Sequence, residues 1–362
     1  MTVKFITRSS FKTLIPNLLG AFHVLAPVHN GDVSFFKRMA ASEEIEWLDH
    51  NTTRPPKEFF LPPSDELFRF QQHGKKIHLT PPLNRHDQKI IVGVRPCDAA
   101  ALSILDRVFS EKGIDVLYTA LRDNTMVIGQ SCWKPGRDCF CTSVGINPAD
   151  SRNMDIMLTD IGEDRFLAQM VSPKGEDFYT YFSHFFQEPG ILSGYIPIQT
   201  KEMAFYLKEK MMFDIRVVKE WLDTHFENPF WANLARRCIG CGACTFLCPT
   251  CYCFDLTDEP MAYQDSGSYQ GYYGLRRRIW DSCSFGHFTP QLISELGRQS
   301  RPAQEQRFRQ RIMHKFKFFV DRFHQLACVG CGRCRSLCPV GIDLVEVLGE
   351  IHDLFYQSCR MV

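Results

Sequence analysis

Eight cysteines form two runs of identical spacing in the C-terminal half of the chain. The first run contains Cys238, Cys241, Cys244 and Cys248, and the second contains Cys328, Cys331, Cys334 and Cys338. A proline follows each run. This C-x2-C-x2-C-x3-C-P spacing holds [4Fe–4S] clusters in two-cluster bacterial ferredoxins. Iron is soft enough to prefer thiolate ligands, so the two runs predict iron–sulfur clusters and a role in handling electrons.

The last cysteine of each such run normally ligates the cluster of the other run. We therefore expect cluster 1 to be held by Cys238, Cys241, Cys244 and Cys338, and cluster 2 by Cys328, Cys331, Cys334 and Cys248. Structural zinc is the alternative, but zinc sites usually have two C-x2-C pairs and four ligands in all. Sixteen cysteines in 362 residues is also below the density of a disulfide scaffold.

Four further cysteines lie in the N-terminal half: Cys97, Cys132, Cys139 and Cys141. Cys97 follows the apolar run of residues 89–94, and Cys132 follows the apolar run of residues 126–129. Both runs predict buried strands, and parallel sheets bind ligands beyond the carboxyl ends of their strands. We therefore expect these thiols to converge on a third cluster. Buried cysteines that pack as small hydrophobes, or a zinc site, are the alternatives.

Three more cysteines, Cys251, Cys253 and Cys283, have two open interpretations. They are an incomplete cubane site that another residue or a partner completes, or they pack beside the first cluster and donate weak hydrogen bonds to its sulfides. Cys359, near the C-terminus, is expected to be a surface or helix-packing thiol.

The elements that position these cysteines change in character along the chain. Residues 1–200 predict an α/β domain, with a strand–helix–strand unit in which Asp98 caps a helix over residues 99–109. Residues 154–171 alternate around a turn and predict a hairpin. Residues 201–362 predict a mostly α-helical dicluster ferredoxin-like domain, helical from 201 to 231 before the first cysteine run.

An insertion at 249–327 separates the two cysteine runs and is basic and helical in pattern, most clearly over residues 291–325. A solvated helix face explains such charges. The alternative is that they stabilise reduced clusters or dock an acidic partner. The arginines concerned are Arg276, Arg277, Arg278, Arg307, Arg309 and Arg311.

Composition excludes several classes of function. The formal net charge is +1, which gives no case for nucleic-acid binding. We find no stretch of eighteen apolar residues and no signal-peptide pattern, so the chain is not expected to span a membrane. Many free thiols favour a reducing cytoplasm, and low-potential clusters suggest an anaerobe. We see no G-x-G-x-x-G after a strand and no P-loop, so no nucleotide site is predicted.

Several segments together carry a family resemblance. They include Arg95-Pro96-Cys97-Asp98, the Cys-Pro-Thr-Cys-x-Cys motif of residues 248–254, and residues 56–60, 139–143, 278–283 and 328–334. In these the chain resembles the iron–sulfur subunit of anaerobic sulfite reductase and the related beta subunit of sulfhydrogenases. The resemblance implies an electron-transfer subunit between a flavin- and nicotinamide-binding diaphorase-type subunit and a catalytic redox subunit. The additional cysteines match the family pattern, which supports the third cluster.

We therefore expect a non-catalytic electron-transfer subunit of an anaerobic multi-subunit oxidoreductase. It relays electrons between a flavin-bearing or ferredoxin-like donor and a catalytic subunit, such as a sulfite reductase or a sulfhydrogenase. The alternative is a catalytic subunit in which the third cluster has an open iron that reduces a small substrate. Four cysteine ligands at that cluster favour the first interpretation, and three favour the second.

Overall fold

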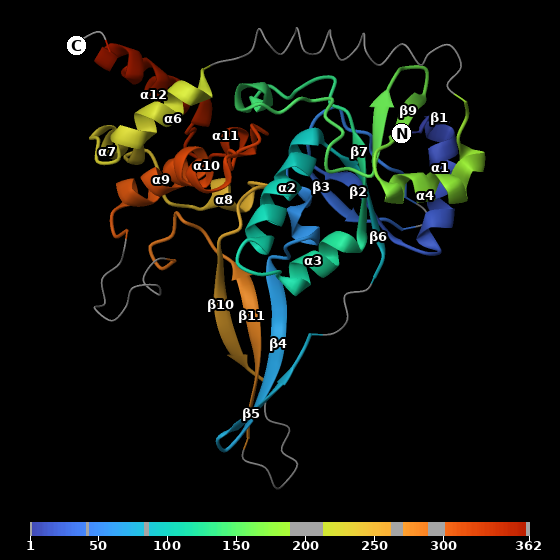
Figure 1. The fold of residues 1–362 in the computed structure, drawn as a ribbon, viewed down its shortest axis with the longest axis horizontal. Helices are drawn as coiled ribbons and strands as arrows, with labels where there is room; N and C mark the ends of the chain where they lie inside the picture. Colours follow the sequence, from blue (N-terminus) through green and yellow to red (C-terminus); the bar gives the residue numbers. More distant parts are fainter. Residues whose placement is uncertain are drawn as a thin grey trace.

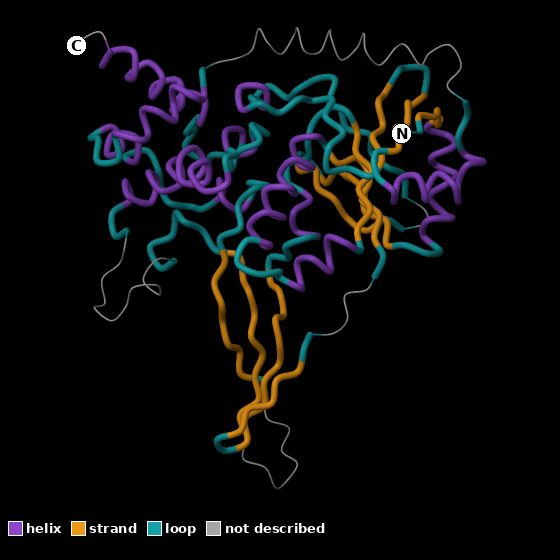
Figure 2. The backbone as a smooth tube through the Cα atoms, in the orientation of Figure 1, coloured by secondary structure: helices purple, strands orange, loops and turns teal. Residues whose placement is uncertain are grey.

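The computed structural model describes residues 2–40, 43–82, 87–188, 213–261, 271–288 and 301–359. It contains a seven-stranded sheet, a group of C-terminal helices beside it, and a four-stranded sheet that projects away from both (Figures 1 and 2). Of the helices in these ranges, none is long and apolar enough to cross a membrane.

The seven-stranded sheet belongs to the N-terminal half of the chain. Its strands in spatial order are β1 (Val3–Thr7), β9 (Arg165–Met170), β8 (Ile156–Asp160), β7 (Thr125–Gln130), β6 (Lys89–Val94), β2 (His23–Asn30) and β3 (Val33–Arg38). The four strands β2, β6, β7 and β8 run parallel to their neighbours in this group, and the outer pairings are antiparallel. The mixed α/β prediction for this half, with its β8–β9 hairpin, is confirmed.

The parallel strands are buried on both faces because helices and loops cover each side. In β6, Ile90 and Val92 pack into one apolar core while Ile91 packs into the other. A continuous apolar run is what such a two-sided strand needs. The helices are α1 (Arg8–Leu19), α2 (Pro96–Ser110), α3 (Val116–Asp123) and α4 (Pro173–Phe182), with short 3₁₀ turns η1 (Pro56–Phe59), η2 (Cys141–Val144) and η3 (Ser183–Phe185).

The strand–helix–strand unit is confirmed, because α2 and α3 connect the parallel strands β6 and β7. The expected helix start is wrong by three residues. The helix begins at Pro96 with Arg95 as its N-cap, since proline suits the first helical position and lacks only an N–H that would be unpaired there. Asp98 therefore lies in the first turn, where its carboxylate pairs with Arg333 instead of capping the helix.

The C-terminal helices pack around their own apolar core, which includes the buried rings of Trp221, Trp231 and Phe316. They are α6 (Ile215–Thr224), α7 (Phe230–Ala235), α9 (Gln304–Met313), the π-helical turn η6 (His314–Phe318), α10 (Phe319–Phe323) and α12 (Leu344–Cys359). Short helices α8 (Ala243–Phe246) and α11 (Arg333–Ser336) lie inside the cysteine runs. Parts of the expected helical segments, 201–212 and 291–300, fall outside the described residues.

The projecting sheet is built from both halves of the chain, so the expectation of a mostly helical C-terminal domain is not confirmed. Its order is β10 (Phe254–Pro260), β11 (Gly271–Trp280), β4 (Ser64–His73) and β5 (Lys76–Thr80). The arginines of β11 form ion pairs with carboxylates of the neighbouring strands, as in that of Arg276 with Asp258 at 2.7 Å. Opposite-charge pairs across neighbouring strands stabilise the sheet.

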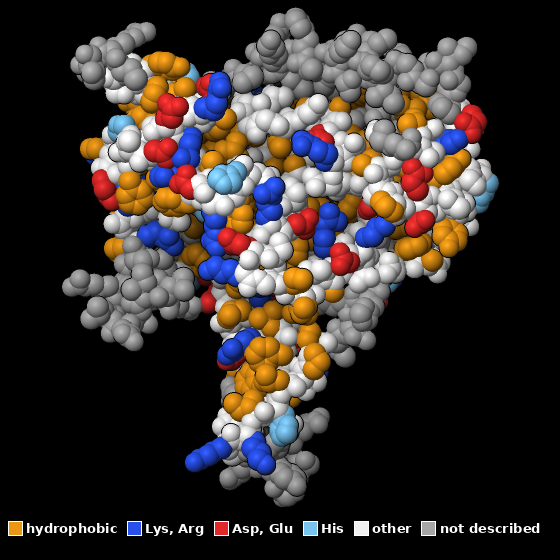
Figure 3. Space-filling model, in the orientation of Figure 1, with side chains coloured by type: hydrophobic (Ala, Val, Ile, Leu, Met, Phe, Trp, Pro, Cys, Tyr) orange, Lys and Arg blue, Asp and Glu red, His pale blue; other side chains and the backbone are white. Residues whose placement is uncertain are grey.

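This four-stranded sheet forms an arm with hydrophobic side chains on its surface (Figure 3). Ile77 and Leu79 are 62% and 63% exposed, and Leu256 is also exposed. Large apolar side chains that gather on a projecting element are typical of an interaction surface.

Candidate iron–sulfur sites

The two cysteine runs fold into the same local structure. Gly240 and Gly242 have φ values of +68° and +75°, and their counterparts Gly330 and Gly332 have +60° and +79°. Residues with a Cβ rarely adopt this left-handed conformation. A Cβ on Gly330 would also lie 2.5 Å from the backbone of Cys141. The sequence repeat is therefore a repeat of two loops with the same backbone turns.

The first cavity gathers the four predicted ligands of cluster 1. Its lining includes Cys238, Cys241, Cys244 and Cys338, together with Cys334. The last cysteine of the second run thus meets the first three cysteines of the first run, which is the exchange that the spacing predicts. The ligand set itself stays a prediction.

Hydrogen-bond donors point at the sulfurs of this first site. The Gln304 side-chain amide donates to Cys238 Sγ at 3.1 Å, and the Gly240 backbone N–H donates to the same sulfur at 3.4 Å. The Ile342 backbone N–H donates to Cys338 Sγ at 3.3 Å. Donors of this kind favour thiolate and tune the reduction potential of a bound cluster. The residues present therefore fit a [4Fe–4S] group.

The second site lies deeper. Cys248 is buried, and it interacts electrostatically with Cys328, Cys331 and Cys334. Burial raises the pKa of Cys328 and Cys334 to about 12. These thiols therefore stay protonated at neutral pH unless a metal displaces the proton, which is how metal binding and thiol ionisation are coupled.

The four N-terminal cysteines also converge. Cys97 lies in the first turn of α2, Cys132 follows the end of β7, and Cys139 and Cys141 flank the start of η2. All four line one cavity, together with Cys331 of the second run. Burial raises the pKa of Cys139 and Cys141 to about 12, so these thiols too stay protonated without a metal. Their convergence beyond the sheet edge is the arrangement that a third cluster needs, and the cluster stays a prediction.

Three hydrogen bonds join the third cavity to the second cysteine run. The Phe140 N–H donates to the Gly330 carbonyl at 2.8 Å. The Asn51 side chain donates to the Cys331 carbonyl at 2.8 Å, and Cys139 Sγ donates to the same oxygen at 3.7 Å. The N-terminal sheet and the second ferredoxin-like loop therefore form one continuous site.

A buried ion pair reinforces this junction. Arg333, in α11, donates two hydrogen bonds to the Asp98 carboxylate, at 2.6 and 2.8 Å. Its Nε donates to the Thr52 carbonyl at 2.7 Å. Both charged side chains are buried, and a bidentate pair of this geometry fixes orientation as well as charge.

The arginines singled out in the sequence divide by role. Four of them form ion pairs with carboxylates, namely Arg276 with Asp258, Arg277 with Glu259, Arg278 with Asp65 and Asp115, and Arg309 with Glu227. Arg307 donates to the carbonyls of Arg301 and Pro302. Arg311 is buried and donates to Cys251 Sγ at 3.7 Å, so the electrostatic interpretation applies to Arg311.

Two buried lysines beside the thiols were missed. Lys315, in η6, donates to Cys248 Sγ at 3.3 Å. Burial opposes its charge, but the nearby Cys248 and Cys251 thiols outweigh burial and raise the pKa of Lys315. Lys57, in η1, donates to the Cys251 carbonyl at 3.0 Å. Lys57 lies in one of the segments that carry the family resemblance, which was the available signal. Lys315 lies among other basic residues of a helical segment, and the sequence carries no signal that distinguishes it.

The remaining three cysteines lie together beside the first two sites. The thiols of Cys253 and Cys283 interact with each other, and the thiol of Cys251 interacts with that of Cys248. Within the described ranges, no three or more His, Cys, Asp or Glu side chains are grouped so as to hold a single metal ion. A four-iron cubane is wider than one ion, so the thiols that bind it stand farther apart.

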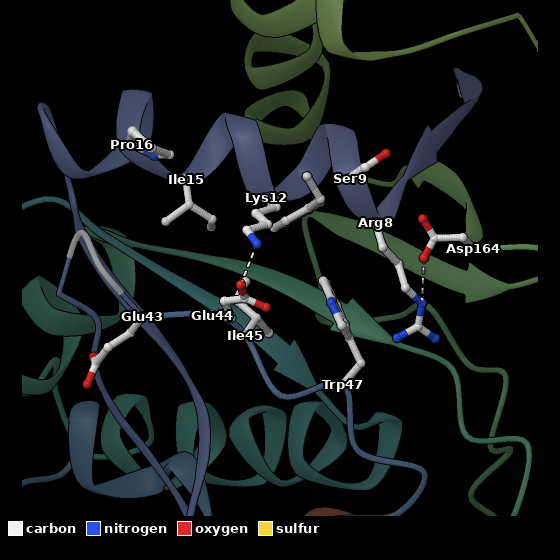
Figure 4. Close-up of a pocket in the computed structure, with 11 residues that line it drawn as sticks. Arg8, Ser9, Lys12, Ile15, Pro16, Glu43, Glu44, Ile45, Trp47 and Asp164 are labelled. Carbon is white, nitrogen blue, oxygen red and sulfur yellow. Dashed lines mark hydrogen bonds and ion pairs between the residues drawn. The ribbon is translucent and has the colours of Figure 1, made fainter.

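A separate cavity lies on the α/β half (Figure 4), and no cysteine is in its lining. It is lined by α1 and the segment around Trp47. Its charged side chains pair with one another, Lys12 with Glu44 and Arg8 with Asp164 at 3.7 Å. Glu43, the remaining charged residue of the lining, pairs with Lys37 outside it, and no thiol lines the cavity.

Comparisons with known proteins agree with the geometry. Residues 237–342 match the family model of the 4Fe-4S dicluster domain. The chain is 30% identical over 332 residues to sulfhydrogenase 2 subunit beta of Pyrococcus furiosus, which covers 91% of this chain and 92% of that protein. No solved structure matches the chain. The similarity to this relative extends over nearly the whole chain, and the two cysteine runs lie within the matched dicluster domain. The chain therefore belongs to the sulfhydrogenase beta-subunit family of iron–sulfur electron-transfer proteins.

Proposed function

We propose that the chain relays electrons between a flavin-bearing or ferredoxin-like donor and a catalytic redox subunit, through three [4Fe–4S] clusters in a row. The observation that carries the proposal is that the second site contributes a cysteine to the wall of each of the other two cavities. Cys331 of the second site also lines the third cavity, and Cys334 of the second site also lines the first cavity. Clusters bound in adjacent cavities supply one-electron carriers at short separations, and electron tunnelling needs short separations.

The proposed ligands are those that the sequence predicts. Cluster 1 takes Cys238, Cys241, Cys244 and Cys338, cluster 2 takes Cys328, Cys331, Cys334 and Cys248, and cluster 3 takes Cys97, Cys132, Cys139 and Cys141. The protein contributes the thiols, the sulfur-directed N–H donors and the buried cations that stabilise negative charge.

The two ends of the row approach the surface. At the first site Cys241 is exposed and the neighbouring Ile239 is 65% exposed. The third site lies under the loop of residues 133–138, where Lys134 and Arg137 are exposed. One end suits a donor and the other an acceptor. A relative named as the beta subunit of a sulfhydrogenase supports assembly into a complex of several subunits. The partners proposed are a diaphorase-type subunit at one end and a catalytic subunit at the other. A reducing cytoplasm suits the many free thiols.

The alternative, a catalytic subunit with an open iron at the third site, needs a third cluster with only three cysteine ligands. Four predicted cysteines line the third cavity, and a fifth belongs to the second site. A complete ligand set leaves no vacant iron there, which favours the relay.

The test is an anaerobic preparation of wild-type protein and the Cys139→Ser variant, with iron, acid-labile sulfide and native mass measured together. We expect the variant to lose about four irons and four sulfides per chain. It should keep the reducible centres of clusters 1 and 2. Cys359→Ser is the matched control and should lose none. A Cys139→Ser protein with undiminished iron would refute the third cluster.

The relay is tested in the same proteins by a pre-steady-state experiment. A flavoprotein donor reduces the protein, and the rate at which electrons reach an artificial acceptor is measured. We expect the Cys139→Ser protein to be reduced at one end only, with transfer across the chain slowed at least tenfold. Unchanged transfer would show that the third site is not on the path.

A further inference from the structure

The projecting arm ends in an edge strand that is exposed along its whole length. β5 pairs with β4 on one side, and within the described residues no strand pairs with its other side (Figure 1). All five of its residues are exposed. The N–H and C=O groups along the outer side of β5 are therefore available to a further strand, which is how edge strands bind extended segments of other proteins.

The side chains of β5 alternate between an apolar and a polar face. Ile77 and Leu79 lie on one face of the sheet, and Lys76, His78 and Thr80 lie on the other. A strand that pairs with β5 in regular register would place its own side chains on the same two faces. Such a strand therefore fits best when apolar side chains on one of its faces extend the row of Ile77 and Leu79.

The apolar face continues across the arm. Leu79 is paired with Phe70 of β4, and Phe70 is paired with Gly274 of β11. The Phe70 ring lies directly over Gly274, where an added Cβ would come within 2.3 Å of it. Leu256 of β10 belongs to the same face by its register and is 50% exposed. Exposed apolar side chains that share one face of a projecting sheet mark an interaction surface.

The end of the arm is also basic (Figure 3). Residues 67–80 include Arg69, Lys75 and Lys76 but no aspartate or glutamate. Arg69 pairs with Glu66 of the same strand at 2.8 Å, whereas the exposed Lys75 and Lys76 have no carboxylate partner among the described residues. The β5 edge therefore attracts a segment that carries negative charge.

A second copy of this chain is a poor occupant of that edge. Two β5 strands would bring lysines of the same sign together, which is unfavourable. Pairing of β5 with the other edge strand, β10, would draw on Asp258 and Glu259, which already pair with Arg276 and Arg277. That contact would also leave a free edge on each copy, so it would propagate as a chain of molecules instead of closing.

We propose that β5 docks another subunit of the complex, which adds an extended segment to the arm as a further strand. In that segment apolar side chains beside Ile77 and Leu79 alternate with acidic side chains beside Lys76. The four strands of the arm contain no cysteine, so the arm anchors a partner without carrying electrons. This inference rests on the assembly proposed above but not on the electron relay.

The first test uses the complex isolated anaerobically from its native cells. A zero-length carbodiimide joins a lysine amine to a carboxylate only where the two are in contact. We expect cross-links from Lys75 or Lys76 to Asp or Glu residues of a different subunit, and slower amide hydrogen exchange of residues 76–80 in the complex than in the isolated chain. Cross-links only to a second copy of this chain, no cross-links from these lysines, or equal exchange in the two samples would overturn the proposal.

The second test replaces the apolar side chains of β5 in the same complex. We expect Ile77→Gln/Leu79→Gln to raise the dissociation constant of the docked subunit at least about tenfold, measured by native mass on dilution. Ile114→Gln/Val116→Gln is the matched control, because these two side chains have the same spacing and are each 70% exposed outside the arm. The control should leave the dissociation constant unchanged. Equal dissociation constants for wild type and Ile77→Gln/Leu79→Gln would overturn the proposal.

The charge on the edge is tested by Lys76→Glu, with Lys112→Glu as the control at an exposed lysine outside the arm. Lys76→Glu should weaken docking at low salt, and the difference from wild type should shrink as salt is raised, since salt screens exposed charges. Unaltered docking at low salt would overturn the acidic partner segment. All these variants should keep the iron and sulfide content of the wild type. A failure of docking therefore changes the composition of the complex, whereas a failure of the relay appears in Cys139→Ser.

Discussion

Replacing Lys315 with methionine should lower the reduction potential of cluster 2. The ammonium group of Lys315 donates to Cys248 Sγ at 3.3 Å, to the Thr250 hydroxyl at 2.8 Å and to the Ala327 carbonyl at 2.8 Å. In the proposed ligand set Cys248 binds cluster 2, so the charge lies next to the electron that the cluster accepts. Methionine fills a similar volume and removes that charge.

The size of the effect follows from the distance. With about 6 Å between Nζ and the cluster centre and an effective dielectric constant of about 20, Coulomb's law gives about 3 kcal/mol for one added electron. For a one-electron couple this is a shift of about 120 mV, since a tenfold change in equilibrium constant is about 59 mV. We expect the potential of cluster 2 to fall by roughly this amount, because the reduced state loses a stabilising charge.

The assay is an anaerobic redox titration followed by the paramagnetic signals of the reduced clusters. Lys317→Met is the matched control, because Lys317 lies in the same π-helical turn but pairs with Asp223 and Asp321 at the surface. It should leave the potentials unchanged, and Lys315→Arg should keep most of the wild-type value. An unchanged or raised cluster 2 potential in a Lys315→Met protein with full iron content would refute this reasoning.

Four further outcomes are expected. Removing one partner of the buried ion pair, by Arg333→Met or Asp98→Asn, should destabilise the protein by about 3–5 kcal/mol. The double variant should lose less stability than the two single variants added together, and thermal unfolding measures the stability of all three. Cys338→Ser should abolish the signal of cluster 1 and spare that of cluster 2, and the reverse result would show that the runs do not exchange ligands. Gly330→Ala should lower iron content, because its Cβ meets the backbone of Cys141; full occupancy would contradict the close approach. Burial and the nearby Lys315 lower the pKa of His314 to about 4 in the folded protein. As the pH drops from about 6.5 to 4, the unfolded chain takes up a proton at this residue before the folded chain does, so the free energy of unfolding should fall by up to about 3 kcal/mol. Thermal unfolding of His314→Gln should show a weaker dependence on pH over this range.

The sequence predicted most where the chemistry is local. The ferredoxin runs carry three of four ligands within seven residues, and their glycines adopt the left-handed conformations that such tight loops need. The convergence of the four N-terminal cysteines was also predictable. Cys97 and Cys132 follow neighbouring parallel strands, and the loops beyond the ends of such strands lie together at one edge of the sheet.

The sequence predicted least where partners are distant. Arg276 and Arg277 lie in the insertion of residues 249–327 that was expected to be helical, but they are on β11. Their carboxylate partners lie on β10, eighteen residues before each arginine in the sequence. No periodicity reveals that pairing. The same applies to Asp98, which looked like a cap because its partner Arg333 lies 235 residues away. Lys57 and Lys315 are buried against segments distant in the sequence, and their local sequence carries no record of such an environment.

The pairing of Asp98 with Arg333 has a consequence for biosynthesis. A ribosome completes the N-terminal sheet long before it adds the residue that neutralises the Asp98 carboxylate, so the nascent sheet holds an unmatched charge until translation is nearly finished. The third cavity likewise lacks its Cys331 wall during that interval. The third cavity therefore closes only when the chain is nearly complete, and truncation before residue 328 would leave it without the Cys331 side.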